Sequence, residues 1–265
     1  MSETNYGKTA PDGKYDVGPV TIQGTRLKHL LRSKYEFAQY PVITDVTADT
    51  TTLPDGSDGD IVLHQYPDGL QLLMANIGIN TIDKPGANAS GMNYGFTQTN
   101  NIGIEWFMGI TGLKGVEGIN KFTVGGPAFF GKLKFSIEDV SGADLAMFGF
   151  RKVEADQADY NDYDEMACLN VISGDINIDS IINAATNVKT DTTDNWADTE
   201  THTLEVYVSK LGLVTYKIDG VAPTAVNATA FSFDIGEIVT PFFHLLNDSD
   251  VVGYVVMQEL EVGYQ

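Results

Sequence analysis

The carboxyl-terminal part of the chain alternates apolar and polar positions with a period of two. In residues 203–209 (TLEVYVS) the side chains at every second position are apolar, and those between them are polar or aromatic. A half-buried β-strand needs this alternation, because successive side chains point to opposite faces of a sheet. The same pattern returns in 213–218, 238–246 and 254–264, and Asp219-Gly220 is a hairpin turn sequence. Four antiparallel strands are therefore expected here.

Further strands are expected upstream at 61–65, 70–75, 102–110, 129–138 and 145–153, and 166–182 reads as two strands or one bent strand. The polar segments 49–60, 83–101, 154–165 and 185–200 are expected to be loops. Many short strands separated by turn-rich segments predict an all-β fold, an antiparallel two-sheet β-sandwich or jelly roll.

The amino-terminal segment has a different composition. Residues 1–24 are rich in Gly, Pro, Thr and Asp and are expected to form an extended arm. In 26–33 (RLKHLLRS) leucines recur at helical spacing, which predicts one short amphipathic helix with Thr25 as its N-cap. The predicted organisation is an arm and basic helix over 1–35, followed by a single β-sandwich domain over 36–265.

Charge narrows the classes of partner. The chain carries a formal net charge of −20, which argues against binding to nucleic acid or to an anionic membrane surface. One basic cluster stands out around the predicted helix, formed by Arg26, Lys28, Arg32 and Lys34. We interpret it as a docking site for an acidic partner, and the alternative is an ordinary solvated helix face.

The single cysteine, Cys168, lies in an apolar run and is expected to be a buried small side chain. The start of the chain is polar and does not resemble a signal peptide. Apolar runs stay well short of the ~18 residues of a membrane-spanning helix. The protein is therefore expected to be made and assembled in a cytoplasm.

Carboxylates that could catalyse hydrolysis are few. Asp175 and Asp179 lie on one face of a predicted strand with Asn177 between them. At ~3.3 Å per residue they are about 13 Å apart, too far for a glycosidase pair. We expect this face, like Glu259 and Glu261 near the carboxyl terminus, to be the solvated side of an amphipathic strand.

Metal and nucleophile motifs are missing. The acidic loop 154–165 and the string 55–60 (DGSDGD) both depart from the EF-hand pattern. The four histidines, His29, His64, His202 and His244, show no zinc-binding spacing. No Gly-x-Ser-x-Gly elbow is present. No cofactor is expected, with a structural Ca²⁺ in one of the two acidic loops as the alternative.

The two tryptophans differ in context. Trp106 lies among large residues in 104–108 (IEWFM) and is expected in the core. Trp196 lies in the polar segment 185–200, where an exposed ring could stack on a glycan or on a neighbouring protein.

The phrases HTLEVYVSKLGLVTYKIDG (202–220) and IVTPFFHLLNDSDVVGYVVMQELEVGYQ (238–265) resemble the concanavalin A-like lectin/glucanase superfamily. Similar strings recur in structural proteins of tailed bacteriophages, and the resemblance extends over roughly residues 100–265. The hydrolases of that superfamily carry Glu-x-Asp-x-Glu on a central strand, which is absent here. The paired metal loop of the legume lectins also has no counterpart.

The resemblance and the missing catalytic motifs lead to one functional hypothesis. The chain is interpreted as a non-enzymatic virion protein, a decoration or cement protein on the capsid exterior of a tailed phage. Its partners would be the major capsid protein and copies of itself in a homo-oligomer. The alternative is a carbohydrate-binding module for host attachment that uses Trp196 and loop 83–101. A glycoside hydrolase is the third hypothesis.

Overall fold

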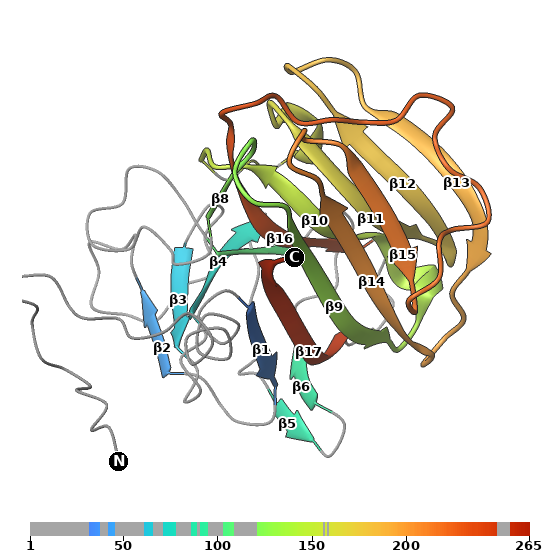
Figure 1. Cartoon of the computed structure of the whole chain (residues 1–265). Helices are drawn as coiled ribbons and strands as arrows, with labels where there is room; N and C mark the ends of the chain where they lie inside the picture. The colour runs from blue at the N-terminus through green and yellow to red at the C-terminus, as the bar shows by residue number, and fades with distance from the viewer. Residues whose placement is uncertain are drawn as a thin grey trace, which may run out of the picture. The chain divides into compact units, whose positions relative to one another are not determined.

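The computed structural model describes residues 32–37, 42–45, 61–65, 71–77, 86–88, 91–94, 103–108, 121–155, 157, 159–247 and 255–265. Residues 34–265 form one compact unit. Two antiparallel β-sheets lie face to face in it, so the predicted β-sandwich is confirmed (Figure 1). The described residues contain no α-helix, only the short 3₁₀ turns η1 (Val140–Gly142) and η2 (Tyr160–Asp162). None of their helical segments could cross a membrane.

The smaller sheet has seven strands. Its order is β15 (Val214–Ile218), β14 (Thr201–Val208), β9 (Phe129–Ile137), β17 (Val255–Tyr264), β6 (Gly91–Tyr94) and β5 (Gly86–Asn88), and β1 (Arg32–Glu36) also pairs with β17. From Lys132 to Ile137 strand β9 alternates, with Leu133, Phe135 and Ile137 facing inward and Lys132, Lys134 and Ser136 outward. One face of this sheet therefore faces the core, and the other carries mostly polar side chains.

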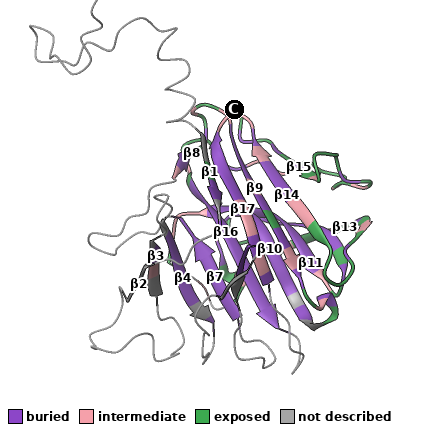
Figure 2. Ribbon diagram, turned by 90° about the horizontal axis from the view of Figure 1, so that it is seen from below, coloured by how far each residue is buried: buried purple, intermediate pink, exposed green. Residues whose placement is uncertain are grey.

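The larger sheet has ten strands. Its order is β13 (Val188–Asn195), β12 (Asp175–Ile181), β11 (Met166–Ile172), β10 (Ala143–Lys152), β16 (Ile238–Asn247), β7 (Gly103–Phe107), β4 (Gln71–Ile77), β3 (Ile61–Gln65) and β2 (Val42–Asp45), and β8 (Phe122–Thr123) pairs with β16. Figure 2 shows the central strands buried along most of their length, whereas β13 is largely exposed.

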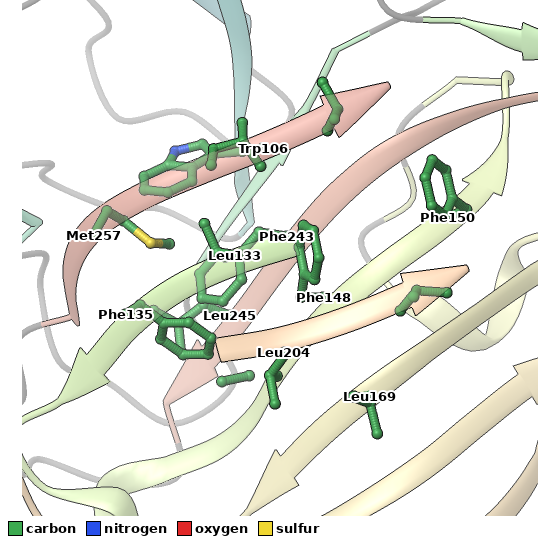
Figure 3. Close-up of a cluster of buried hydrophobic side chains, with 14 of the residues drawn as sticks. Trp106, Leu133, Phe135, Phe148, Phe150, Leu169, Leu204, Phe243, Leu245 and Met257 are labelled. Atoms are coloured by element: carbon green, nitrogen blue, oxygen red, sulfur yellow. The ribbon is translucent and has the colours of Figure 1, made fainter. Parts of the chain in front are cut away.

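The main core lies between the two sheets. Phe135 and Leu204 of the smaller sheet meet Phe148 and Phe243 of the larger sheet there, with Trp106 on the same layer (Figure 3). The rings of Phe135 and Phe243 pack edge to face with centroids 5.3 Å apart. Aromatic pairs in this geometry add to the free energy gained from burying apolar area.

A second apolar cluster lies on the other face of the ten-stranded sheet. It contains Met147 and Cys168 together with Phe107 and Phe242. Strands β10, β11 and β16 are therefore buried on both faces, which explains why their sequences are nearly continuous apolar runs rather than alternating ones. Cys168 is fully buried, as expected from the sequence.

Most predicted strands are confirmed. The segments 61–65, 129–138, 145–153 and 238–246 correspond to β3, β9, β10 and β16, and 166–182 contains two strands rather than one bent strand. The turn at Asp219-Gly220 is also confirmed: both residues have positive φ, at 52° and 83°. This is the backbone conformation that an Asp-Gly hairpin turn requires.

Two predicted loops contain strands, and one predicted helix is wrong in part. The polar segment 185–200 contains strand β13, whose single buried side chain, Thr192, gives no apolar alternation. The segment 83–101 contains β5 and β6, whose Gly- and Asn-rich sequences also lack that signal. The helix expected over 26–33 is contradicted at its last two residues, because Arg32 and Ser33 belong to strand β1. Residues 26–31 lie outside the described residues, as do the arm 1–24 and the loop 49–60.

A crossover segment, residues 219–236, connects the edges of the two sheets. It begins at β15, where Ile218 and Val221 exchange backbone hydrogen bonds. It then reaches β13, where Thr224 N and Oγ1 donate to the Asp194 carboxylate at 2.9 and 2.7 Å. Ala225 N also donates to Thr192 O at 2.9 Å. These hydrogen bonds join edge strand β15 of the smaller sheet to edge strand β13 of the larger sheet through the crossover segment.

Candidate functional site

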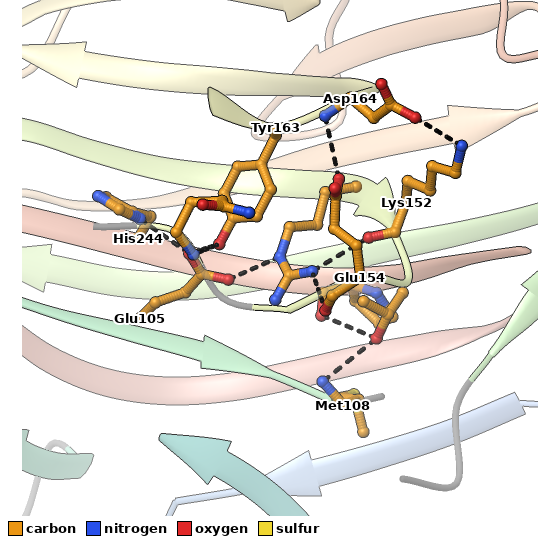
Figure 4. A network of polar contacts seen from close by, with 11 residues as sticks. Glu105, Met108, Lys152, Glu154, Tyr163, Asp164 and His244 are labelled. Atoms are coloured by element: carbon orange, nitrogen blue, oxygen red, sulfur yellow. Dashed lines mark hydrogen bonds and ion pairs between the residues drawn. The ribbon is translucent and has the colours of Figure 1, made fainter. Parts of the chain in front are cut away.

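A buried polar network occupies the outer face of the ten-stranded sheet, the face turned away from the main core (Figure 4). Its centre is Glu105 on β7. Arg151 Nε on β10 donates to Glu105 Oε1 at 2.6 Å, and the Tyr163 hydroxyl donates to Oε2 at 2.6 Å. His244 Nδ1 on β16 lies 2.9 Å from the same Oε2. Because a carboxylate only accepts, the proton of this last bond is on the imidazole.

The charges within this network compensate one another. Burial alone would raise the pKa of Glu105, but Arg151 and the hydrogen bond from His244 outweigh it and hold that pKa below its usual range. The Arg151 guanidinium also lies over the rings of Phe107 and Tyr163, at 4.9 and 4.5 Å from their centroids. Glu105 is thus a fully partnered carboxylate, whose arrangement suits a structural role.

The network fixes the loop 153–165 against the sheet. Tyr163 anchors the loop to Glu105, and its hydroxyl also accepts a hydrogen bond from Gln157 N at 3.0 Å. At the base of the loop, Lys152 Nζ lies 2.7 Å from Asp164 Oδ2. The loop sequence is acidic and contains no apolar pattern, so its anchoring by Tyr163 was not predictable from the sequence.

This anchored loop presents a small polar and aromatic surface, here called the Tyr160 surface: Tyr160, Asn161, Asn187 and Val188. The Tyr160 ring is partly exposed, and it packs edge-on against His244 with centroids 6.2 Å apart. Asn187 Nδ2 donates to the Tyr160 hydroxyl at 3.3 Å and to Asn161 Oδ1 at 3.5 Å. Val188 beside it is 55% exposed. Burial and the nearby Asp179 raise the pKa of Tyr160 to about 12.

Two buried polar side chains lie beneath the Tyr160 surface and are here called the polar floor: Asn170 on β11 and Asp179 on β12. Asn170 Nδ2 donates to Asp179 Oδ2 at 3.0 Å. Burial raises the pKa of Asp179, against the lowering effects of Asn170 and Lys189. Within the described part of the chain, Asn170 Oδ1 and Asp179 Oδ1 accept no hydrogen bond. Unsatisfied buried atoms of this kind are rare and call for an explanation.

The strand 175–181 therefore differs from its sequence-based interpretation. Asp175 is exposed as expected, but Asn177 is largely buried and Asp179 is completely buried. The expected solvated face was wrong at Asp179, because the outer face of this sheet is covered near Tyr160 and Asn187. At the carboxyl terminus, Glu259 pairs with Lys34 and Glu261 is also largely buried.

The predicted stacking residue Trp196 is buried, with only 2% of its surface exposed. Its ring packs against Phe135 and His202 at centroid distances of 4.7 Å each. Its Nε1 donates to Glu200 O at 3.1 Å. Trp196 thus extends the core, and the prediction of an exposed binding ring was wrong. Trp106 lies in the core as expected.

The predicted docking cluster is only partly described. Arg26 and Lys28 lie outside the described residues, and Arg32 is in strand β1 rather than in a helix. Lys34 Nζ lies 2.7 Å from Glu259 Oε2 of β17, and its side chain is half exposed. This lysine is therefore in an intramolecular ion pair. Docking by Arg26 and Lys28 stays a prediction.

Metal-binding and cavity features are limited in the described residues. No group of three or more His, Cys, Asp or Glu side chains among them could hold a metal ion, and the string 55–60 lies outside this part of the chain. A cavity of about 20 Å³ between the sheets is lined by apolar side chains such as Phe37, Leu133 and Leu260. This volume suits a water molecule rather than a ligand.

Comparison with known proteins gives a likeness of fold. No family model matches the chain, and no curated protein matches it. Among solved structures, a protein of unknown function from Shewanella oneidensis MR-1 superposes with a TM-score of 0.51 at 9% identity, covering 92% of this chain and 93% of that chain. The Emp47p carbohydrate recognition domain gives 0.48 at 11% identity, with 89% and 98% covered. A prokaryotic β-1,3-1,4-glucanase (lichenase) derived from a mouse hindgut metagenome gives 0.45 at 8% identity, with 89% and 100% covered.

Of these three likenesses, the first alone reaches a TM-score of 0.5, and at 9% identity it concerns the fold alone. The recognition domain and the glucanase both superpose with TM-scores below 0.5. The antiparallel two-sheet β-sandwich expected from the sequence is confirmed by the strand pairing, and the concanavalin A-like resemblance stays a resemblance. None of the three neighbours is named as a phage protein.

Proposed function

We propose that this chain is a non-catalytic carbohydrate-binding module and that its ligand contacts the Tyr160 surface. The observation that carries the proposal is the partly exposed Tyr160 ring beside the amides of Asn161 and Asn187. An aromatic ring offers a flat apolar face to the C–H groups of a sugar, and amides donate to and accept from its hydroxyls. The loop that carries Tyr160 is anchored through Tyr163 and Glu105, so the surface is organised before a ligand arrives.

Binding without hydrolysis is proposed because of where the buried carboxylates lie. Glu105 is on β7 and Asp179 is on β12, four strands apart in the sheet order. At ~4.8 Å between neighbouring strands, that separation is about 19 Å. Glycosidase carboxyls are ~5–5.5 Å apart in retaining enzymes and ~6.5–9.5 Å apart in inverting ones. Glu105 is also partnered by Arg151 and Tyr163, which suits anchoring rather than proton transfer.

A glycan array followed by calorimetry on the best ligand tests this proposal. Tyr160→Ala is expected to weaken binding by at least about tenfold, since the stacking contact is lost. Tyr207→Ala is the matched control, because Tyr207 is also partly exposed but lies on β14 of the other sheet. A wild-type protein that binds no glycan, or a folded Tyr160→Ala variant that binds as well as wild type, would refute the proposal. Reducing-sugar release would refute its non-catalytic part.

A structural role in a tailed-phage particle is the second candidate, with the protein as cement on the capsid exterior. The outer face of the seven-stranded sheet supports it. Lys217, Glu205, Lys132 and Glu261 are in register across four neighbouring strands, so charges alternate along one row. The ion pair between Lys132 Nζ and Glu205 Oε2 spans 2.8 Å. Glu205 and Glu261 are largely buried, so the row presents mainly its two lysines to a neighbouring capsid subunit or to another copy of the chain.

Particles purified from an infected culture test the second candidate. A cement protein co-purifies with the capsid at a fixed copy number relative to the main shell protein. Removal of residues 1–31 is expected to abolish binding to undecorated capsids if the arm docks. Absence from particles, or a trace amount without fixed stoichiometry, would exclude the structural role.

A further inference from the structure

The unsatisfied atoms of the polar floor share one chemical property. Asn170 Oδ1 and Asp179 Oδ1 are both acceptors that receive no hydrogen bond from the described residues, and both side chains are completely buried. The Asn170 amide cannot be reversed to remove this deficit, because its Nδ2 donates to the Asp179 carboxylate at 3.0 Å. An occupant that satisfies these atoms must therefore bring hydrogen-bond donors.

The charges around the Tyr160 surface also favour a ligand that brings donors, because they favour a positively charged one. Asp159 is the N-cap of η2, Asp162 is its last residue, and both are exposed. Asp179 lies beneath the ring, close enough to raise the pKa of the Tyr160 hydroxyl. On the neighbouring strand, Lys189 is in register with Asp179, and Asp191 follows two residues later. Carboxyl groups thus outnumber ammonium groups next to the Tyr160 surface, which favours a cationic ligand over an anionic one.

Access to the polar floor depends on Asn187. Its hydrogen bonds to the Tyr160 hydroxyl and to Asn161 Oδ1 are long, at 3.3 and 3.5 Å, and its side chain also hydrogen-bonds the Asp179 carboxylate. Hydrogen bonds between nitrogen and oxygen are usually about 2.9–3.0 Å, and longer ones are weaker. A ligand that reaches Asp179 therefore has to displace the Asn187 amide and replace its hydrogen bond to Asp179 with donors of its own.

We propose that the Tyr160 surface binds sugars that carry a free, protonated amine, with the ammonium group directed at the Asp179 carboxylate. This inference rests on the proposed glycan binding and names its ligand class. The ammonium group supplies three donors to a site whose open atoms are acceptors. A metal cation could bind the same oxygens, so the experiment also measures binding with and without a small metal cation in the buffer.

Calorimetry with matched oligosaccharides tests the proposal. The probes are a glucosamine tetramer, its N-acetylated form and a uronic acid tetramer, at a pH where the amine is protonated. Wild-type protein is expected to bind the amine form at least about tenfold more tightly than the N-acetylated form, and the uronic acid form more weakly still. Equal affinity for the amine and N-acetylated forms would overturn the ligand class but leave glycan binding intact. Failure of all three probes and of the glycan array would instead remove the proposed function.

Three variants and one exchange of salt test whether the preference for the amine form depends on Asp179. Asp179→Asn keeps the shape and is expected to abolish the preference for the amine. Asp175→Asn, the same change at the exposed end of the same strand, is expected to leave it unchanged. Lys189→Gln is expected to increase it, because a competing cation is removed. An equal effect of Asp175→Asn and Asp179→Asn would overturn the proposal. In the arm for a metal cation, potassium chloride replaces tetramethylammonium chloride at equal ionic strength, and loss of the preference for the amine form would also overturn the proposal.

Discussion

Arg151 Nε and Glu105 Oε1 lie 2.6 Å apart, and both side chains are fully buried in the outer layer of the ten-stranded sheet. Such a pair stabilises a fold only while both partners are present, because each charge has lost its hydration. Tyr163 and His244 complete the hydrogen bonding of Glu105. The pair therefore links three strands to the loop that carries Tyr160.

Removing one partner of this pair is expected to be costly. Glu105→Gln leaves the Arg151 charge buried without its counter-charge, and the free energy of unfolding is expected to fall by about 3–5 kcal/mol. The double variant Glu105→Leu/Arg151→Met removes both charges and is expected to lose much less. Urea unfolding of the three proteins measures the difference. A double variant less stable than Glu105→Gln would contradict this account.

Stability is expected to fall in mild acid because of His64. Burial lowers the pKa of His64 from 6.5 to about 4. The unfolded chain therefore binds the proton more tightly than the folded one, so the contribution of His64 is complete above pH 6.5 and is lost as the pH falls towards 4. At about 1.4 kcal/mol per pH unit, the loss amounts to about 3 kcal/mol. Chemical unfolding at several pH values measures it, and His64→Phe should show a correspondingly smaller pH dependence.

Trp196 is expected to contribute to stability and not to ligand binding. Trp196→Ala removes a ring packed on Phe135 and should lower the free energy of unfolding by about 3–5 kcal/mol. Trp196→Phe should cost less, since part of the volume is retained. Thermal unfolding measures the first effect, and the glycan affinity of folded Trp196→Phe measures the second. Loss of glycan affinity in folded Trp196→Phe would restore the interpretation of Trp196 as a binding residue.

Gly149 is expected to tolerate no side chain. A Cβ at this position would lie 2.2 Å from Ala167 O and 2.6 Å from the Cys168 Cβ, so strands β10 and β11 would have to separate. Gly149→Ala is expected to cost about 1–3 kcal/mol, the range of core overpacking. Gly131→Ala serves as the comparison, because its Cβ would meet only the ring ends of Phe148 and Phe150, at 3.2 Å. Similar losses in both variants would show that the backbone contact does not limit Gly149.

The sequence predicted the strands whose side chains alternate or form apolar runs, such as β9 and β16. It failed for β13, where Thr and Asp replace the apolar positions because the strand lies at a sheet edge. Trp196 was misplaced because polar neighbours surround it in sequence, while its contacts, Phe135 above all, come from distant strands.

Most of the candidate site could not be predicted from the sequence. Glu105, Arg151 and His244 lie on three strands that become neighbours only in the folded sheet, and Arg151 and Glu105 are 46 residues apart. A single glutamate in an otherwise apolar strand gave the one available signal, since a buried carboxylate requires a partner. Tyr160 lay within a segment that the acidic composition marked only as a loop.

The crossover segment also affects the colloidal behaviour of the protein. An edge strand normally offers a row of unpaired backbone groups on which another molecule can polymerise. Here Ala225 N donates a hydrogen bond to Thr192 O. Hydrogen bonds from Thr224 to Asp194 keep the crossover segment against β13. The crossover segment thus shortens the open stretch of β13, which disfavours edge-to-edge pairing with another copy of the chain.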